Sequence, residues 1–443
     1  MAGRKLPGIS VPHRKHTAEK IPRRLPVPPM VCIPVSMHIG APARPVVQVG
    51  DTVKVGQLIA EADGAMSSPV YSGVSGKVKK IDDLLMSAGQ RVPAVVIETD
   101  GEQAGSGAFT APCVSDFATF IGAVRQSGVV GLGGAGFPTA VKLDVADLSK
   151  LETIIVNGAE CEPYITSDTR TMIDDAESVR GGVMLLREYM KAKDIVIAVE
   201  KNKPRCIKIF SEMFRDDGHV RVAALPAVYP QGAEKVLIYN TTGRLVPEGG
   251  LPIDIGVIVI NCTTLAAIEK YIRTGTPLYE KCVTVDGSAV ASPGNVIVPI
   301  GTPLRDVFAF CGGFSERPGK VLYGGPMMGI AVPDLEQTVL KNTNAVLALS
   351  AREAEPPEET ACIRCGRCMA RCPLRLSPAE IESAYRRNRP DELEALRVGL
   401  CMECGCCAYV CPANRHLVQT NKLSKALLRS YRAVKPAVKE ESA

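Results

Sequence analysis

Two cysteine runs near the C-terminus constrain this chain more than any other feature. Each follows the pattern C-x2-C-x2-C-x3-C-P, first from Cys362 to Pro373 and again from Cys401 to Pro412. Three thiolates within seven residues can bind three irons of one 4Fe–4S cluster, whereas the fourth cysteine of such a run normally binds the other cluster. The spacing therefore predicts two clusters with exchanged fourth ligands: Cys362, Cys365, Cys368 and Cys411 for one, and Cys401, Cys404, Cys407 and Cys372 for the other. A zinc site could explain one run, but two runs of identical spacing favour iron–sulfur.

Composition limits what else the chain can be. At 443 residues it is long for a single core, so three or four domains are expected. It contains no run of about 18 apolar residues, so no segment is expected to cross a bilayer, and its start lacks the apolar core of a signal peptide. Eight of the 16 cysteines lie outside the ligand sets in mostly apolar surroundings, which favours a reducing, cytosolic compartment. Cys406, one place off the spacing, is among these eight and is not expected to bind iron.

Basic charge is concentrated at both ends of a chain whose net charge is +5. Residues 1–30 form a proline-rich arm with seven Lys or Arg and one Glu in its first 24 positions, and residues 421–443 form a basic tail. The prolines predict an extended arm rather than a helix. Such an arm could steer the protein toward an acidic partner or an anionic membrane, or it could be a solvated segment. Nucleic-acid binding is not expected, because no aromatic residues are interleaved with the basic ones.

Two modules are expected between the arm and residue 253. Residues 31–100 alternate short apolar stretches with Gly and Pro, the pattern of small β-hairpins, and they resemble the barrel-sandwich fold of biotinyl and lipoyl carriers. Carriers present a lysine at a hairpin tip, whereas this tip, Ala62 to Met66, has none, so no carrier function is expected. Strands then alternate with helices over residues 115–253, which predicts a parallel sheet with helices on both faces, a Rossmann-like α/β domain.

Two further modules complete the predicted fold, which is a multidomain α/β protein. The pattern changes at residue 254, and residues 254–335 resemble the soluble-ligand-binding β-grasp (SLBB) domain. An acidic linker leads into residues 356–420, which hold both cysteine runs and resemble a two-cluster bacterial ferredoxin. Helices are expected to start near Ser377 and to cover Asp391 to Val398.

A glycine-rich loop opens the α/β module. It contains Gly131, Gly133, Gly134, Gly136 and Phe137, and Lys142 follows it. Closely spaced glycines let backbone N–H groups surround a phosphate, and the lysine could reach the same anion. Because the loop is neither a dinucleotide fingerprint nor a P-loop, the residues alone leave a tight turn as the alternative.

The sequence of this loop, GLGGAGFPTAVKL, resembles the flavin loop of the NADH-binding 51-kDa subunit of respiratory complex I. Later segments agree with that family, from Asn157 to Arg170 and around Glu234 and Asn261, although Ala159 stands where the family has an aspartate. The resemblance implies that FMN is held by Gly133, Gly134, Lys142, Asn157, Asn261 and Thr264, within the loop that also contains Gly131, Gly136 and Phe137. It implies that Glu160, Glu162 and Glu234 lie nearer the flavin or the nicotinamide nucleotide.

The order of modules resembles the RnfC family, the C subunits of Rnf electron-transport complexes, across essentially the whole chain. The segments from Pro12 to Thr17 and from Met37 to Pro42 are similar to that family too. The resemblance implies a peripheral protein on the cytoplasmic side of the cell membrane, held by other Rnf subunits within an ion-translocating ferredoxin:NAD oxidoreductase complex. It implies two 4Fe–4S clusters, FMN and NAD(H) as cofactors, with Glu160 and Glu162 orienting the nucleotide.

The implied chemistry converts two-electron transfer into one-electron transfer. Nicotinamide exchanges a hydride, clusters take single electrons, and a flavin does both, while the protein supplies position and electrostatics. One alternative is a cobalamin reductase of propanediol-utilising microcompartments, which resembles the same modules but has its barrel-sandwich region late in the chain. The other is a non-enzymatic electron-wire subunit, which would contain iron and sulfide but no FMN.

Overall fold

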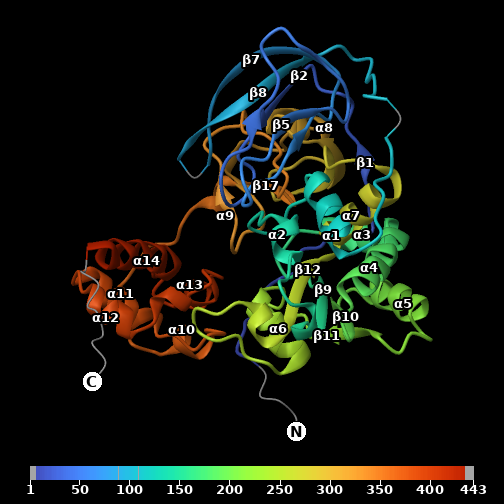
Figure 1. Cartoon of the computed structure of the whole chain (residues 1–443). Coiled ribbons are helices and arrows are strands. Elements are labelled where there is room, and N and C mark those ends of the chain that lie inside the picture. Colours follow the sequence, from blue (N-terminus) through green and yellow to red (C-terminus); the bar gives the residue numbers. More distant parts are fainter. Residues whose placement is uncertain (1–5, 88, 108, 435–443) are drawn as a thin grey trace.

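The chain folds into four modules, which a computed structural model describes for residues 6–87, 89–107 and 109–434 (Figure 1). In Figure 1 the barrel-sandwich strands lie at the top, the α/β sheet at the lower right, and the cysteine-run module at the left. None of the helices in this described part of the chain combines the length and apolarity that a membrane crossing requires. The ends of the predicted basic arm and tail, residues 1–5 and 435–443, lie outside the described residues.

The N-terminal arm is extended, as its prolines predict, and it packs along the other modules. Strand β1 (Arg23–Arg24) pairs with β14 (Gly294–Pro299) at the edge of the β-grasp sheet. Ile9 pairs with Tyr229 of the α/β domain, and both Ile9 and Val11 are buried. The described part of the arm is therefore anchored to two modules at these residues, while many of its other side chains remain exposed.

Two small antiparallel sheets form the barrel-sandwich module, in the orders β2-β8-β7-β4 and β3-β5-β6. The strands are β2 (Met30–Pro34), β3 (Arg44–Pro45), β4 (Thr52–Val53), β5 (Leu58–Glu61), β6 (Val70–Tyr71), β7 (Gly76–Leu85) and β8 (Arg91–Thr99). Apolar residues of both sheets share one core with the α/β domain. The lysine-free tip is the loop between β5 and β6, as expected.

A four-stranded parallel sheet of order β11-β10-β9-β12 builds the α/β domain. Its strands are β9 (Thr153–Gly158), β10 (Asp194–Glu200), β11 (Val220–Leu225) and β12 (Val257–Asn261). Its helices are α1 (Phe117–Gln126), α2 (Thr139–Leu143), α3 (Ser167–Asp174), α4 (Ala176–Met190), α5 (Pro204–Met213), α6 (Glu234–Thr242) and α7 (Cys262–Thr274), with short 3-10 turns at Leu148–Lys150 and Pro252–Ile255.

The connections of this sheet reverse direction beside β9. The chain runs from β9 through β10 to β11 on one side, then crosses back to β12 on the other side of β9. In open α/β sheets such a reversal leaves a crevice beyond the carboxyl ends of the two strands, and ligands bind there. A cofactor site is therefore expected in the crevice between β9 and β12.

The parallel sheet extends past residue 253, where the sequence pattern placed the end of the module. Both β12 and α7 were expected in the β-grasp module, yet β12 pairs with β9 and α7 packs on α4. The packing is close, because a Cβ added to Gly182 of α4 would lie 2.5 Å from Leu265 of α7. A strand followed by a helix has the same local pattern in either module, so only the pairing reveals to which sheet it belongs.

Six strands make up the β-grasp sheet, in the order β1-β14-β13-β17-β15-β16. In addition to β1 and β14 it contains β13 (Glu280–Asp286), β15 (Pro318–Tyr323), β16 (Ile330–Ala331) and β17 (Ala345–Ser350), with helix α8 (Leu304–Phe310) and, after β17, α9 (Ala351–Ala354). The central strand β17 is buried throughout and lies beyond residue 335, the predicted end of this module.

Short helices surround the cysteine runs in the last module. They are α10 (Arg367–Ala370), α11 (Pro378–Arg386), α12 (Pro390–Ala395), a 3-10 turn (Val398–Leu400), α13 (Cys406–Tyr409) and α14 (Leu417–Val434). Residues 421–434 were expected in a basic tail, but they form most of α14, which packs on α11 and α12. Burial of Asn421, Ser424 and Leu428 explains the difference, because these residues give the helix a packed face.

Candidate iron–sulfur and flavin sites

Five cysteines from both runs line one pocket, and Cys406, one place off the ligand spacing, is the fifth. Cys372 of the first run lies there with Cys401, Cys404 and Cys407 of the second. Burial raises the pKa of the Cys372 thiol, and so do its neighbours Cys404 and Cys401. The Asn421 amide donates to the Cys401 sulfur at 3.4 Å, a contact that stabilises a thiolate. The structure therefore gathers the four residues that the exchanged ligand pattern assigns to one cluster.

The remaining four cysteines of the two runs are more exposed. Cys362 and Cys365 are exposed, and Cys368 is half-buried. Burial raises the pKa of Cys368, and the nearby Cys411 thiol of the second run raises it further. Each fourth cysteine thus lies with the other run, as the spacing predicts. That these thiols bind iron stays a prediction.

A single metal ion does not fit these thiols. Across residues 6–87, 89–107 and 109–434, no three His, Cys, Asp or Glu side chains are arranged to hold one ion. Zinc needs its thiolates within about 2.3 Å of the metal. The thiolates of a 4Fe–4S cluster each bind a different iron and stand farther apart.

The glycine loop lies at the crevice between β9 and β12. Gly133 packs so closely on Asn261, at the end of β12, that an added Cβ would lie 2.4 Å from the Asn261 Nδ2. The Leu132 N–H donates to the Thr264 Oγ1 at 2.9 Å, which fixes the loop to the start of α7. A Cβ on Gly134 would meet nothing within 4 Å. The loop is thus held on one side and open on the other, a shape that fits a planar ligand lying against its backbone.

Two asparagines mark the carboxyl ends of the strands that border the crevice. Asn157 and Asn261 are paired neighbours in the β9–β12 register. The Asn261 side chain accepts the Thr264 N–H at 3.0 Å and donates to Asp168 at 2.8 Å. The Asn157 amide donates to the Gly232 carbonyl at 3.0 Å. These contacts orient both amides within the protein, which is the preorganisation that a cofactor site needs.

Lys142 and Glu234, both predicted to lie near the cofactor, form an ion pair. The Lys142 Nζ lies 2.6 Å from the Glu234 Oε1 and donates to the Val259 carbonyl at 2.9 Å. Both side chains remain about one-third exposed, at 34% and 39%. An anion that enters the crevice can therefore displace Glu234 and bind the Lys142 ammonium group. Contact between Lys142 and a flavin phosphate stays a prediction.

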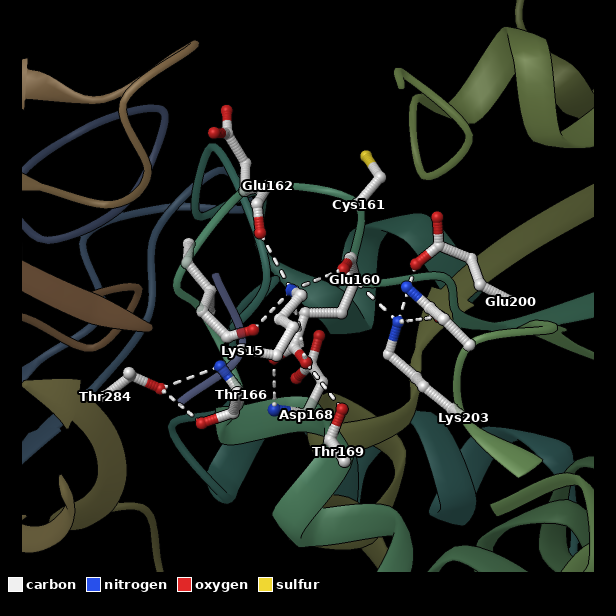
Figure 2. A network of polar contacts seen from close by, with 12 residues as sticks. Lys15, Glu160, Cys161, Glu162, Thr166, Asp168, Thr169, Glu200, Lys203 and Thr284 are labelled. Carbon is white, nitrogen blue, oxygen red and sulfur yellow. Dashed lines mark hydrogen bonds and ion pairs between the residues drawn. The ribbon is translucent and has the colours of Figure 1, made fainter. Parts of the chain in front are cut away.

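Lys15 of the arm lies at the centre of a buried polar network (Figure 2). Its Nζ donates to the carbonyl oxygens of Glu160 and Glu162, both at 2.8 Å, and to that of Ile165. Burial lowers the pKa of Lys15, whereas the nearby Glu160 carboxylate raises it. The arm thereby fixes the backbone of the segment that follows β9.

The Glu160 carboxylate is buried, and each of its oxygens accepts a hydrogen bond. Its Oε1 accepts the Asp168 N–H at 2.8 Å, and its Oε2 accepts the Thr169 hydroxyl at 2.7 Å (Figure 2). Lys203 donates to the Glu200 carboxylate at 2.6 Å and to the Glu160 carbonyl at 3.3 Å. Burial raises the pKa of Glu160 to about 7. Its contacts in the structure orient the start of α3, and its action on a nucleotide stays a prediction.

The Glu162 carboxylate is directed away from this network, as Figure 2 shows. It accepts the N–H groups of Met327 at 3.1 Å and Met328 at 2.8 Å, in a turn of the β-grasp module. Burial raises the pKa of Glu162 to about 7. A Cβ added to Gly405 of the second cysteine run would lie 3.1 Å from the Met327 carbonyl oxygen. The segment after β9 thus connects with the cysteine-run module through one turn.

Tyr229 joins the α/β domain directly to the buried thiol set. Its hydroxyl donates to the Cys404 carbonyl at 2.6 Å, and the Cys406 sulfur lies 4.0 Å from the Tyr229 carbonyl oxygen. These three residues share an apolar cluster with Ile9 and Val11 of the arm. The second cysteine run is therefore packed against the domain that carries the glycine loop.

Sequence reasoning missed the roles of Lys15, Lys203 and Tyr229. Lys15 counted as a positive charge of a basic arm and as part of a family-like segment, without a role of its own, yet it bonds to Glu160 across 145 positions of the chain. Tyr229 contacts Cys404 across 175 positions. No local pattern signals such contacts, because each depends on how modules far apart in sequence are packed.

Family models match four consecutive regions of the chain. They are the RnfC barrel sandwich hybrid domain at residues 5–102, the Nuo51 FMN-binding domain at 124–270, the SLBB domain at 282–331 and the 4Fe-4S dicluster domain at 358–415. The FMN-binding match includes β12 and most of α7, in agreement with the sheet.

Curated relatives match most of the chain. The C subunit of a proton-translocating ferredoxin:NAD(+) oxidoreductase complex of Clostridium ljungdahlii is 42% identical, over 83% of this chain and 80% of its own length. The Na(+)-translocating counterpart of Acetobacterium woodii is 40% identical, over 88% of both chains. The C subunit of an ion-translocating oxidoreductase complex of Rhodobacter capsulatus is 38% identical, over 88% of this chain and 75% of its own.

Solved structures share the fold at low identity. A chain of an air-oxidised NAD+-reducing NiFe hydrogenase matches with a TM-score of 0.51 and 20% identity, over 73% of this chain and 67% of its own. The H2-reduced form matches with a TM-score of 0.50 and 19% identity, over 71% of this chain and 63% of its own. At such identity the likeness concerns the fold alone.

Proposed function

This chain belongs to the RnfC family, and from that premise we propose that it exchanges electrons with NAD(H) as the peripheral subunit of an ion-translocating ferredoxin:NAD(+) oxidoreductase complex. An FMN-binding domain and a 4Fe-4S dicluster domain within one chain supply the cofactor sites that this electron exchange requires. FMN, when bound, takes a hydride from NADH and gives up single electrons that iron–sulfur clusters accept.

The observation that carries this proposal is the junction between the α/β domain and the buried thiol set. Tyr229 bonds to the Cys404 backbone at 2.6 Å, and Gly405 packs against Met327. Met327 is in turn bonded to Glu162 of the segment that follows β9. Close, ordered packing between the two cofactor-binding regions supports a protein built to pass electrons between them.

Residues around the crevice are proposed to hold FMN. Gly133 lets the loop pack against Asn261, and the free space at the Cβ position of Gly134 gives the backbone room to lie against the flavin. Asn157, Asn261 and Thr264 present oriented polar groups at the strand ends. Lys142 would bind the flavin phosphate in exchange for Glu234, and Glu160 and Glu162 would help orient the nucleotide.

The two ligand sets are proposed to hold one 4Fe–4S cluster each. Cys372, Cys401, Cys404 and Cys407 form the buried set, and Cys362, Cys365, Cys368 and Cys411 form the exposed set. Because the described helices include no membrane span, attachment to the cytoplasmic side of the cell membrane would come through other subunits of the complex. No nucleic-acid partner is proposed.

The module order favours this function over a cobalamin reductase. The barrel-sandwich match at residues 5–102 precedes the FMN-binding match at 124–270, whereas the reductase alternative expects the barrel-sandwich region later.

Membrane reconstitution tests the proposed function. Membranes from cells that lack only this chain should fail to reduce NAD+ with reduced ferredoxin, and the purified chain with its cofactors should restore the activity. Full NAD+ reduction by membranes without the chain would contradict the proposal. Restoration by a chain stripped of FMN would contradict the flavin assignment.

A further inference from the structure

The two cysteine runs have the same spacing, but only one of them is packed against another module. Gly366 and Gly405 occupy the same place in the two runs. A Cβ on Gly405 would lie 3.1 Å from the Met327 carbonyl oxygen, whereas a Cβ on Gly366 would meet nothing within 4 Å. Ile363 is 68% exposed, while Met402, at the same place in the second run, packs into the junction with Tyr229.

The uncovered run also carries a cluster of unpaired positive charge. We define the first-run face as residues 362–375. It contains Arg364, Arg367, Arg371 and Arg375, all exposed, and no acidic residue. Within the described chain none of these arginines forms an ion pair with a carboxylate, and Arg371 has only a 3.4 Å bond to the Gly8 carbonyl. Most other exposed arginines of this module, such as Arg387 and Arg389, are paired with acidic neighbours.

Compensation of cluster charge does not explain these arginines. Both clusters would have four thiolate ligands and hence similar charge. The second run, from Cys401 to Pro412, contains no lysine or arginine. Its Glu403, which matches Arg364 in position, is bonded to Lys425 of α14 at 2.6 Å. If each cluster required basic neighbours within its run, the second run would have them too.

Apolar side chains lie among the same arginines. Ile363 is 68% exposed and Met369 is 51% exposed, and both lie between ligand cysteines. Exposed apolar groups bordered by arginine are typical of protein–protein interfaces, in which arginine and methionine are enriched. The unpaired charge specifies the partner, because an acidic surface would complement it and a basic one would be repelled.

We propose that the first-run face is the docking surface for an acidic electron-carrier protein surface, supplied by another subunit of the complex. The inference rests on the proposed function and adds to it the location and charge of the contact. The second run is packed against Tyr229 and Met327 of this chain. The corresponding side of the first run is left exposed, where a partner outside this chain can bind.

Charge reversal on the first-run face tests the proposal. The test uses the full chain with its cofactors and the membranes that contain the complex without this chain. Arg364→Glu/Arg367→Glu should weaken binding to these membranes by about tenfold or more at low salt. Raising the ionic strength should weaken binding of the wild-type chain and reduce the difference between the two proteins, because salt screens exposed charges. Arg375→Glu, outside the ligand spacing, should show a smaller loss of the same kind.

A matched control reverses an exposed arginine elsewhere. Arg215 lies after α5 without a carboxylate partner among the described residues, so Arg215→Glu should bind like the wild-type chain. Vesicles of anionic lipid without the complex provide the second control. Equal loss of binding to these vesicles would mean that the arginines bind lipid, which would overturn the proposal.

Two further outcomes are decisive. Unchanged membrane binding of the double variant would overturn the docking surface. Loss of iron from the double variant, or loss of the absorbance change on addition of NADH, would overturn it too, because the arginines would then serve the cluster. If the wild-type chain itself did not bind the membranes, the proposed function within the complex would fail instead. The iron content and NADH response of the isolated variants therefore separate the two failures.

Discussion

At the scale of single residues, buried charge in this protein acts mainly on the backbone. Lys15 bonds to three carbonyl oxygens within residues 160–165, while its nearest carboxylate oxygen, on Glu160, is 4.0 Å away. A lysine used in this way shapes a loop, because it satisfies carbonyl groups that no strand or helix can pair.

Replacement of Lys15 tests that role. Lys15→Met removes the lysine donor from three carbonyls, of which that of Glu160 keeps a longer bond from Lys203 at 3.3 Å. It should lower the free energy of unfolding by about 3 kcal/mol, since each unsatisfied group costs about 1–3 kcal/mol and the loop can partly relax. FMN content should fall as well. Denaturant titration and flavin analysis measure both effects. Lys20→Met, which removes one exposed bond to Pro293 in the same arm, should change little; equal effects of the two would contradict the account.

The exchanged ligand sets make a second prediction at this scale. Cys372→Ser should remove about four iron atoms per chain, those of the cluster bound by the second run, because Cys372 lies among that run's thiols. Cys406→Ser should leave both clusters in place. Iron and sulfide analysis with electron paramagnetic resonance distinguishes the clusters. Loss of the first run's signal alone would mean that each run binds its own cluster.

At the scale of elements, the crevice results from strand order rather than from any one residue. The reversal beside β9 brings Asn157 and Asn261 together at neighbouring strand ends. The glycine loop then rests on Asn261, and Thr264 at the start of α7 holds it there. The site is therefore assembled from segments more than 100 residues apart.

Two neighbouring glycines separate loop packing from cofactor binding. Gly133→Ala should destabilise the protein and reduce FMN binding, because its Cβ would clash with Asn261 at 2.4 Å. Gly134→Ala has no protein atom within 4 Å of its Cβ, so it should reduce FMN binding while the stability of the FMN-free chain stays unchanged. Flavin titration and thermal unfolding of the FMN-free chains measure the two quantities. Normal FMN affinity in Gly134→Ala would contradict the placement of the flavin.

Because Lys341 is a buried amine, we expect the stability of the protein to depend on pH. Its Nζ lies fully buried and donates to the carbonyls of Pro69 at 2.6 Å and Gly128 at 2.8 Å, which joins three modules. Burial lowers its pKa from 10.5 to about 7. Between these values this amine binds more protons in the unfolded chain than in the folded one, so its contribution to the free energy of unfolding rises from pH 7 toward pH 10.

Lys341→Met should reduce this rise, leaving the part that comes from Lys281, whose pKa burial also lowers to about 7. Denaturant unfolding across the pH range measures the slope. Lys208→Met, at a side chain 75% exposed, should keep the wild-type slope. An unchanged slope in Lys341→Met would mean that the buried amine stays charged or titrates elsewhere.

At the scale of the whole molecule, the arrangement of modules joins the two cofactor regions. The arm, the segment after β9 and the turn at Met327 all meet at the second cysteine run. The junction depends on few polar contacts, of which the bond from Tyr229 to Cys404 is the most direct.

Tyr229→Phe tests this junction. It removes the hydroxyl that donates to the Cys404 carbonyl and leaves that buried acceptor unpaired, at a cost of about 1–3 kcal/mol. Cluster and FMN contents should stay normal, while reduction of the clusters by NADH slows in stopped-flow absorbance. Tyr409→Phe, at an exposed tyrosine of the cysteine-run module, should react at the wild-type rate. Equal rates in all three proteins would show that the junction bond has no part in electron exchange.

Much of this organisation could be predicted from the sequence, and the exceptions have a common cause. Cysteine spacing is local, so it predicted the exchange of fourth cysteines, which is seen in the position of Cys372 among the second run's thiols and of Cys411 near Cys368. Strand β12 and the central strand β17 were placed outside their modules because a strand pattern does not identify its neighbours. The arm and α14 were predicted as basic ends because charge can be read directly from the sequence. Which of their residues are packed depends on contacts with distant segments. Family resemblance named the crevice residues, and long-range contacts alone revealed Lys15 and Tyr229.

The central claim is that one chain takes electrons from NADH through a flavin and delivers them to its clusters. Anaerobic titration of the isolated protein with NADH, followed by visible absorbance, tests it most directly. The account predicts bleaching of a flavin band together with loss of cluster absorbance. A chain with full FMN content whose clusters do not respond to NADH would contradict it, and a chain that binds clusters but cannot be reconstituted with FMN would be an electron wire.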